Sequence, residues 1–135
     1  MRVFLDTNVL VTAFATRGLC AAVLELVLLD HDLVVGRNVL RELDKALRDK
    51  VRLPAGRSVE IVEFVASEAI QVVAKAEPAK ADVDAADALV LGEALAGRAA
   101  SFVTGDAALL RLDIVGELKI VSPRQFWEVL RAGNG

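Results

Sequence analysis

The sequence is poor in the residues on which several common kinds of site depend. It has a single cysteine, Cys20, which excludes an internal disulfide and a cysteine-based zinc site. It has a single histidine, His31, which excludes a multi-histidine metal site and argues against a Ser-His-Asp hydrolase. Three prolines and nine glycines in 135 residues are too few for a collagen-like or low-complexity chain. The five phenylalanines and one tryptophan stand mostly at core spacings, so no platform for stacking bases is predicted.

Long apolar runs are missing as well. No stretch reaches the roughly 18 uninterrupted apolar residues of a membrane span, because Glu25, Asp30 and Asp32 interrupt the most apolar region, residues 19–35. Asp6 cuts short the apolar start of the chain, so no secretory signal is predicted and we expect a cytoplasmic protein. The formal net charge of −3 argues against nucleic-acid binding through bulk charge, but it leaves room for a local basic patch.

Short apolar runs alternate with helical patterns along the chain, which is typical of an α/β fold with a parallel sheet. The length fits one domain, expected over residues 1–131, with a frayed tail over residues 132–135. The expected strands are residues 3–5, 32–35, 69–73, 101–104 and 118–121. The expected helices begin near Asn8 and cover residues 19–29, 37–50, 58–67, 84–96 and 106–110, followed by a terminal helix capped by Ser122.

Five acidic residues stand at positions that a parallel sheet would bring together. Asp6 directly follows the first expected strand, and Asp106 follows the fourth. In open parallel sheets, ligands bind outside the carboxyl ends of the strands. Glu42 borders the apolar face of the helix after the second strand, and Asp84 and Asp87 share a face at the start of the helix before the fourth. We therefore expect these carboxylates to converge at one edge of the sheet.

A cluster of this kind is stable only if it is protonated or bound to a cation. Two unpaired carboxylates about 4 Å apart repel each other by roughly 4 kcal/mol at an effective dielectric constant of 20. Hard oxygen ligands suit Mg²⁺ or Mn²⁺ rather than zinc. Such an ion lowers the pKa of a bound water and clamps a phosphodiester during hydrolysis. The acids therefore predict a metal-dependent nuclease that needs no nucleophilic side chain.

Each acid also has a purely structural explanation. Asp6, Asp84 and Asp106 each precede an expected helix and could serve as its N-cap, and for Asp84 we favour the cap over direct ligation. Asp87 could be the polar partner of that cap, and Glu42 could form a weak surface ion pair. Taken singly, the structural explanation is the better one. The coincidence of four acids at one edge favours the metal site.

At these residues the sequence resembles the PIN-domain family of Mg²⁺-dependent ribonucleases. The resemblance is carried by Leu5-Asp6-Thr7-Asn8, Leu40-Arg41-Glu42-Leu43, residues 84–87 and Val103-Thr104-Gly105-Asp106. It covers roughly residues 2–130. Within the family, the length and the early first motif look like a VapC-type toxin of a prokaryotic toxin–antitoxin system.

The resemblance implies a three-layer α/β/α fold, with a central parallel sheet of about five strands in the order 3-2-1-4-5. It implies that one or two Mg²⁺ or Mn²⁺ ions are held by Asp6, Glu42, Asp87 and Asp106. Asp84 is a further candidate ligand, and Asn8 and Thr104 would hold waters and carboxylates in position. It also implies an RNA substrate, an antitoxin partner and pairing as a homodimer.

Basic side chains follow one stripe of the helix over residues 37–50. Arg37, Arg41 and Lys45 could contact RNA phosphates or could simply form a solvated outer face, and the sequence favours neither. Two alternatives for the whole protein also stay open. One is an RNA-processing nuclease of the same fold without an antitoxin, and the other is a non-catalytic PIN-like module that binds partners.

Overall fold

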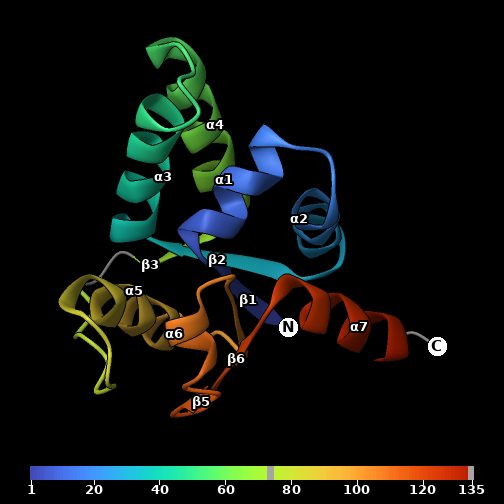
Figure 1. Cartoon of the computed structure of the whole chain (residues 1–135), viewed down its shortest axis with the longest axis vertical. Helices are drawn as coiled ribbons and strands as arrows, with labels where there is room; N and C mark the ends of the chain where they lie inside the picture. The colour runs from blue at the N-terminus through green and yellow to red at the C-terminus, as the bar shows by residue number, and fades with distance from the viewer. Residues whose placement is uncertain (73–74, 134–135) are drawn as a thin grey trace.

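In the computed structural model, which describes residues 1–72 and 75–133, a single six-stranded sheet separates two layers of helices (Figure 1). The strands are β1 (Arg2–Leu5), β2 (Asp32–Gly36), β3 (Ile70–Val72), β4 (Ser101–Val103), β5 (Ile114–Val115) and β6 (Leu118–Val121). The helices are α1 (Thr7–Ala15), α2 (Leu19–Asp30), α3 (Arg37–Asp49), α4 (Ala55–Glu68), α5 (Ala85–Ala96), α6 (Ala107–Leu110) and α7 (Pro123–Gly133).

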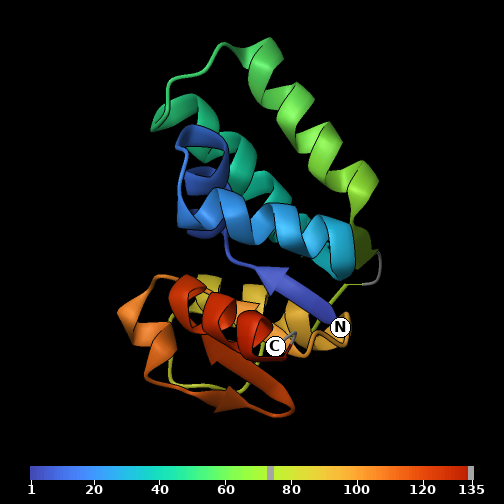
Figure 2. The same cartoon turned by 90° about the vertical axis from the view of Figure 1, so that its right-hand side faces the viewer.

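The sheet has the order β3-β2-β1-β4-β6-β5. From β1 the chain moves outward through β2 to β3, and it then crosses back through α5 to β4 on the other side of β1. Because such crossovers are right-handed, this reversal places α1 to α4 on one side of the sheet and α5 and α6 on the other (Figure 2). The carboxyl ends of β1 and β4 lie at the switch point, where parallel sheets bind their ligands.

The central strands are buried on both faces, which explains why they are continuous apolar runs rather than alternating ones. Val3, Phe4 and Leu5 of β1 are completely buried. The ring of Phe4 stacks on that of Phe102 in β4, with ring centroids 5.3 Å apart. Full burial of one such side chain contributes about 1.5–3 kcal/mol to the free energy of unfolding. The residues just after β1 and β4 are therefore anchored on the buried centre of the sheet.

The three-layer α/β/α fold is confirmed, and the five parallel strands occur in the predicted order. The sheet also contains a sixth strand that was not predicted. This strand, β5, has only two residues and pairs antiparallel with β6, so that Ile114 lies opposite Lys119. A two-residue strand has no measurable periodicity. Its pairing depends on the tight turn at Gly116, whose φ of 61° is a conformation that glycine adopts readily.

Several predicted boundaries shift. Helix α4 begins at Ala55 rather than at Ser58, because Pro54 occupies the N-cap position and its carbonyl accepts the first helical hydrogen bonds. Strand β3 covers Ile70–Val72, and Val73 of the expected strand lies outside the described residues. Helix α7 continues to Gly133, so the expected frayed tail is helical at its first two residues, whereas 134–135 lie outside the described part.

Within residues 1–72 and 75–133, no single helix is both long and apolar enough to cross a membrane. Helices α1 and α2 reach that combination of length and composition only when taken together, and they meet at an angle of 105°. Several of their apolar side chains, including Leu10, Val23 and Val27, are buried in the core.

Candidate metal centre

A cavity of about 480 Å³ opens at the carboxyl edge of the sheet, where β1 and β4 end. Its charged lining includes Asp6, Glu42, Asp87 and Asp106, together with Lys45 and Lys50. The four acids come from four separate places: the end of β1, the middle of α3, the first turn of α5 and the start of α6. The structure thus brings all four predicted metal ligands to the walls of one cavity.

Asp6 is the most enclosed of these acids, with 9% of its surface exposed. Its carboxylate accepts hydrogen bonds from the backbone N–H of Thr7 at 2.9 Å, the hydroxyl of Thr104 at 2.7 Å and the side-chain amide of Asn8 at 3.3 Å. Burial raises the pKa of Asp6 and two neighbouring carboxylates raise it further, whereas the hydrogen bonds from Thr104 and Thr7 lower it. The net effect is a raised pKa of Asp6. The hydrogen bonds hold its carboxylate in place, but there is too little positive charge nearby to offset its burial.

Asp106 is fixed at the end of β4 by local hydrogen bonds. Its backbone N–H donates to the hydroxyl of Thr104 at 3.1 Å, and its carboxylate caps α6 by accepting from the N–H of Ala108 at 2.8 Å. The N–H of Gly105 donates to the side-chain oxygen of Asn8 at 3.3 Å. Thr104 and Asn8 therefore both tie the end of β1 to the end of β4. These contacts match the orienting role expected of them, which itself stays a prediction.

Glu42 lies on α3 and is half-buried beside the apolar face that includes Leu43. The hydroxyl of Thr7 donates to Glu42 Oε2 at 2.7 Å. No role was predicted for Thr7 from the sequence, although it stands directly after Asp6. Its position as the first residue of α1 was the available signal, because side chains there lie beside the end of β1. Thr7 thus links the first and second expected ligands.

Asp84 and Asp87 have different surroundings despite their spacing. Asp84 is exposed, caps α5 by accepting from the N–H of Asp87 at 2.8 Å, and does not line the cavity. Asp87 lines it, and its pKa is raised to about 6, first by burial and then by the carboxylates of Asp84, Asp106, Asp6 and Glu42. The negative charges around this cavity therefore act on one another across it.

The donor set fits a hard divalent cation in its chemistry. All four acids offer carboxylate oxygens, and none of them forms an ion pair among the described residues. In the same part of the chain, no three acidic, histidine or cysteine side chains stand close enough together to share one ion as they are placed. Carboxylates without a cation repel one another. Ligation of Mg²⁺ or Mn²⁺ by these four residues therefore stays a prediction.

The expected phosphate contacts separate into two groups. Lys45 lines the cavity, whereas Arg37 and Arg41 are exposed and lie outside its lining. Lys50, which was not among the expected phosphate contacts, lies at the C-terminal end of α3 and also lines the cavity. The signal was its location about two turns beyond Glu42 on the same helix. The cationic part of the lining comes from the C-terminal half of α3.

Replacing Thr7 by valine should weaken Mn²⁺ binding by about tenfold, because the isosteric side chain can no longer hold Glu42 through a hydrogen bond. Replacing it by serine keeps the hydroxyl, so binding should stay near the parental affinity. Titration calorimetry with Mn²⁺ measures both variants against the parent. Equal affinities of the valine variant and the parent would show that Thr7 does not position a metal ligand.

Comparison with known proteins identifies the class to which this fold and site belong. The model of the PIN domain family matches residues 2–108. The chain therefore belongs to the PIN domain family. No curated protein matches the chain.

Two solved structures show the same fold. One is the structure of VapBC2 from Rickettsia felis bound to a DNA fragment from its promoter. The match has a TM-score of 0.64 and 17% sequence identity, and it covers 90% of this chain and 98% of that one. The other is VapBC-1 from nontypeable Haemophilus influenzae, with a TM-score of 0.63 and 16% identity, covering 92% of this chain and 99% of that one. At these identities the likeness shows the fold.

Proposed function

We propose that this protein is a metal-dependent endoribonuclease that hydrolyses RNA phosphodiesters. The observation that carries the proposal is the cavity at the sheet edge, which carboxylates from four elements line. Burial and the neighbouring carboxylates together raise the pKa of Asp87 to about 6. Asp6, Glu42, Asp87 and Asp106 would hold one or two Mg²⁺ or Mn²⁺ ions. When bound, these ions supply an activated water and neutralise charge on the phosphate.

The other polar residues of the site orient the acids in this proposal. Thr104 and Asn8 donate to Asp6 and fix its carboxylate at the end of β1. Thr7 holds Glu42 toward the cavity. Asp84 is assigned to the cap of α5, which fixes the first turn of the helix that carries Asp87. Hydrogen bonds of this kind orient metal ligands and so set the geometry of a site.

We further propose that the protein is the toxin of a toxin–antitoxin pair, with residues 1–131 as its single domain and the cytoplasm as its location. The match of fold to two VapBC structures supports an antitoxin partner. Apolar surface on α2 supports contact with an antitoxin or a second copy in a homodimer, since Leu19 and Leu29 are 36% and 71% exposed. Neutralisation by a short protein encoded beside this one would separate a toxin from an RNA-processing nuclease.

Metal-dependent cleavage of single-stranded RNA tests the central proposal. Cleavage should stop when EDTA is added and return when Mg²⁺ or Mn²⁺ is restored in excess. Because water is the nucleophile and no 2′-hydroxyl is needed, the products should carry a 5′-phosphate and a 3′-hydroxyl. Activity that persists in EDTA, or products ending in a 2′,3′-cyclic phosphate, would contradict the mechanism. RNA binding without any cleavage would favour the non-catalytic module.

A further inference from the structure

We infer that the RNA strand occupies two adjoining cavities at once. Lys45 and Lys50 bind its phosphates on one side of the carboxylates, and the neighbouring nucleoside lies in a second cavity beside Cys20. The inference rests on the proposed function and deepens it, because it assigns a path to the substrate. Neither Lys50 nor the second cavity entered the sequence-based expectations.

The second cavity adjoins the first at the proposed metal centre. It has a volume of about 360 Å³, and its lining includes Cys20 and Pro123. It shares Asn8, Thr12 and Asp106 with the first cavity. Because Asp106 belongs to both walls, a ligand that spans the two cavities must pass directly over the carboxylates. A polymer with a scissile bond in its middle is the kind of ligand that such a path fits.

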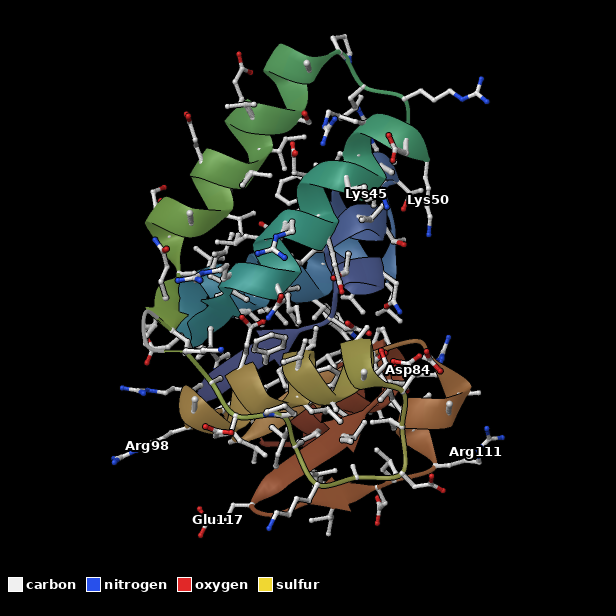
Figure 3. All side chains as sticks on the ribbon, turned by 90° about the vertical axis from the view of Figure 1, so that its left-hand side faces the viewer. Lys45, Lys50, Asp84, Arg98, Arg111 and Glu117 are labelled. Atoms are coloured by element: carbon white, nitrogen blue, oxygen red, sulfur yellow. The ribbon has the colours of Figure 1, made fainter. Side chains whose placement is uncertain are left out.

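The first cavity carries positive charge at the end away from the sheet. Lys45 lies three residues beyond Glu42 and Lys50 lies eight residues beyond it, which is about 12 Å along α3. Figure 3 shows both lysines on the same side of the molecule as Asp84 at the start of α5. Neither lysine forms an ion pair among the described residues. Asp49, from the same end of α3, also lines the cavity, and the net charge of Lys45, Asp49 and Lys50 together is positive.

Two lysines near a metal centre fit the backbone of a nucleic acid. A lysine binds phosphate as a point charge and needs no particular orientation. Each phosphate that a protein neutralises releases counterions, so binding through Lys45 and Lys50 has a measurable salt dependence. A substrate without charges flanking the scissile bond would leave both lysines without a role.

The second cavity has a different chemistry. Apart from the shared Asp106, its lining carries no charged side chain, and it combines Thr12 and Asn8 with Cys20, Gly105 and Pro123. A phosphate has no cationic partner there, whereas a ribose or base finds hydroxyl, amide and apolar contacts. The two sides of the carboxylates therefore recognise different parts of a nucleotide, which gives the bound strand a direction.

The lysine arm of the test measures binding without cleavage. Binding of a fluorescent single-stranded oligoribonucleotide of about 12 nucleotides is followed by anisotropy, with Ca²⁺ in place of Mg²⁺. The variants Lys45→Ala and Lys50→Ala should each bind about fivefold more weakly at about 0.1 M salt, and the slope of log affinity against log salt should shrink by about 0.7. The double variant should lose about 25-fold. Lys80→Ala, an exposed lysine outside both cavities, should match the parent.

The second arm uses the single cysteine as a probe. The pKa of Cys20 is raised by burial, so labelling with iodoacetamide is measured at mildly alkaline pH, where more thiolate is present. The same RNA at about ten times its Kd should slow this labelling by about tenfold, the factor set by occupancy. Cys20→Phe, whose larger side chain takes up part of the cavity, should weaken RNA binding, whereas Cys20→Ser should not.

The outcomes distinguish this inference from the proposed function. The path would be overturned, even if RNA is cleaved, if the double lysine variant bound RNA with the affinity and salt slope of the parent. It would also be overturned if RNA left the rate of Cys20 labelling unchanged. If the lysine and Cys20 results are both obtained in Ca²⁺ but no RNA is cleaved in Mg²⁺ or Mn²⁺, the path is supported and the proposed nuclease activity is overturned. Mn²⁺ affinity of the lysine variants should not fall, because neither lysine is a metal ligand. A loss there would point to structural damage and count against the inference.

Discussion

Replacing Asp6 or Asp106 by asparagine is expected to lower the rate of metal-dependent RNA cleavage by at least about a hundredfold. Both carboxylates line the cavity at the switch point of the sheet. Losing one removes a negative oxygen from the proposed metal centre, so nucleophile activation and charge stabilisation at the phosphate are both impaired. The measurement is a single-turnover cleavage rate in saturating Mn²⁺, for each variant against the parent.

Asparagine is the informative replacement because it keeps one side-chain oxygen that can accept from the backbone N–H group that each acid contacts. Its side-chain oxygen can still cap a helix about as well as aspartate does, so the hydrogen bonds to the N–H groups of Thr7 and Ala108 can persist. Asp44→Asn serves as the matched control, since Asp44 is on α3 but outside the cavity and pairs with Arg48. A melting temperature far below that of the parent in metal-free buffer would show that Asp106 is structural.

The metal-free protein is expected to become less stable, through Asp87, as the pH rises from about 4 to above 6. The pKa of this carboxyl is about 6 in the folded protein, against a usual value of 3.8, because burial and four carboxylates disfavour its charge. A raised folded-state pKa means that the folded state binds the proton more tightly. The stabilisation of the folded state by protonated Asp87 is complete at pH values below the pKa of this group in the unfolded chain. It is lost as the pH rises through the folded-state pKa of about 6.

The neutral variant Asp87→Asn should therefore melt above the parent at pH 7 in EDTA, and the difference should vanish near pH 4. Excess Mn²⁺ should reverse the order, since binding to the folded parent alone adds about 2.7 kcal/mol at about 100 times Kd. Thermal melts of both proteins across this pH range, with and without Mn²⁺, measure the effect. Glu63→Gln, an exposed acid on α4, is the control. A parent that melts above Asp87→Asn in EDTA at pH 7 would show that Asp87 stabilises the fold as an anion.

Much of the fold could be predicted because the parallel strands are buried on both faces and so appear as uninterrupted apolar runs. Residues 3–5 and 33–35 are examples, and both fall within observed strands. The same pattern places Asp6 directly after the first run and Asp106 three residues after the run that ends at Val103. Strand β5 was not predicted, because two residues beside a turn show no periodic pattern. Their pairing depends on the neighbouring strand β6.

Contacts between elements distant in sequence could not be predicted in this way. Glu93 lies within the apolar helix α5, yet it is 4% exposed and its carboxylate accepts from the backbone N–H of Asn38 at 2.9 Å. A Cβ at Gly36 would collide with that carboxylate, so the glycine before α3 is required by the packing of α5 against it. No local pattern marks this arrangement, because it depends on how two helices from different crossovers meet.

The sequence alone determined the alternation of strands and helices, and with it the edge of the sheet at which Asp6 and Asp106 emerge. These features follow from short-range periodicity and from the rule that parallel strands end at a common edge. Only the tertiary structure decided that Thr7 contacts Glu42, that Asp84 lies outside the cavity, and that Lys50 lines it. The physical reason is that a side chain's partners across a cavity depend on how the helices pack on the sheet, which the spacing within any one helix does not specify.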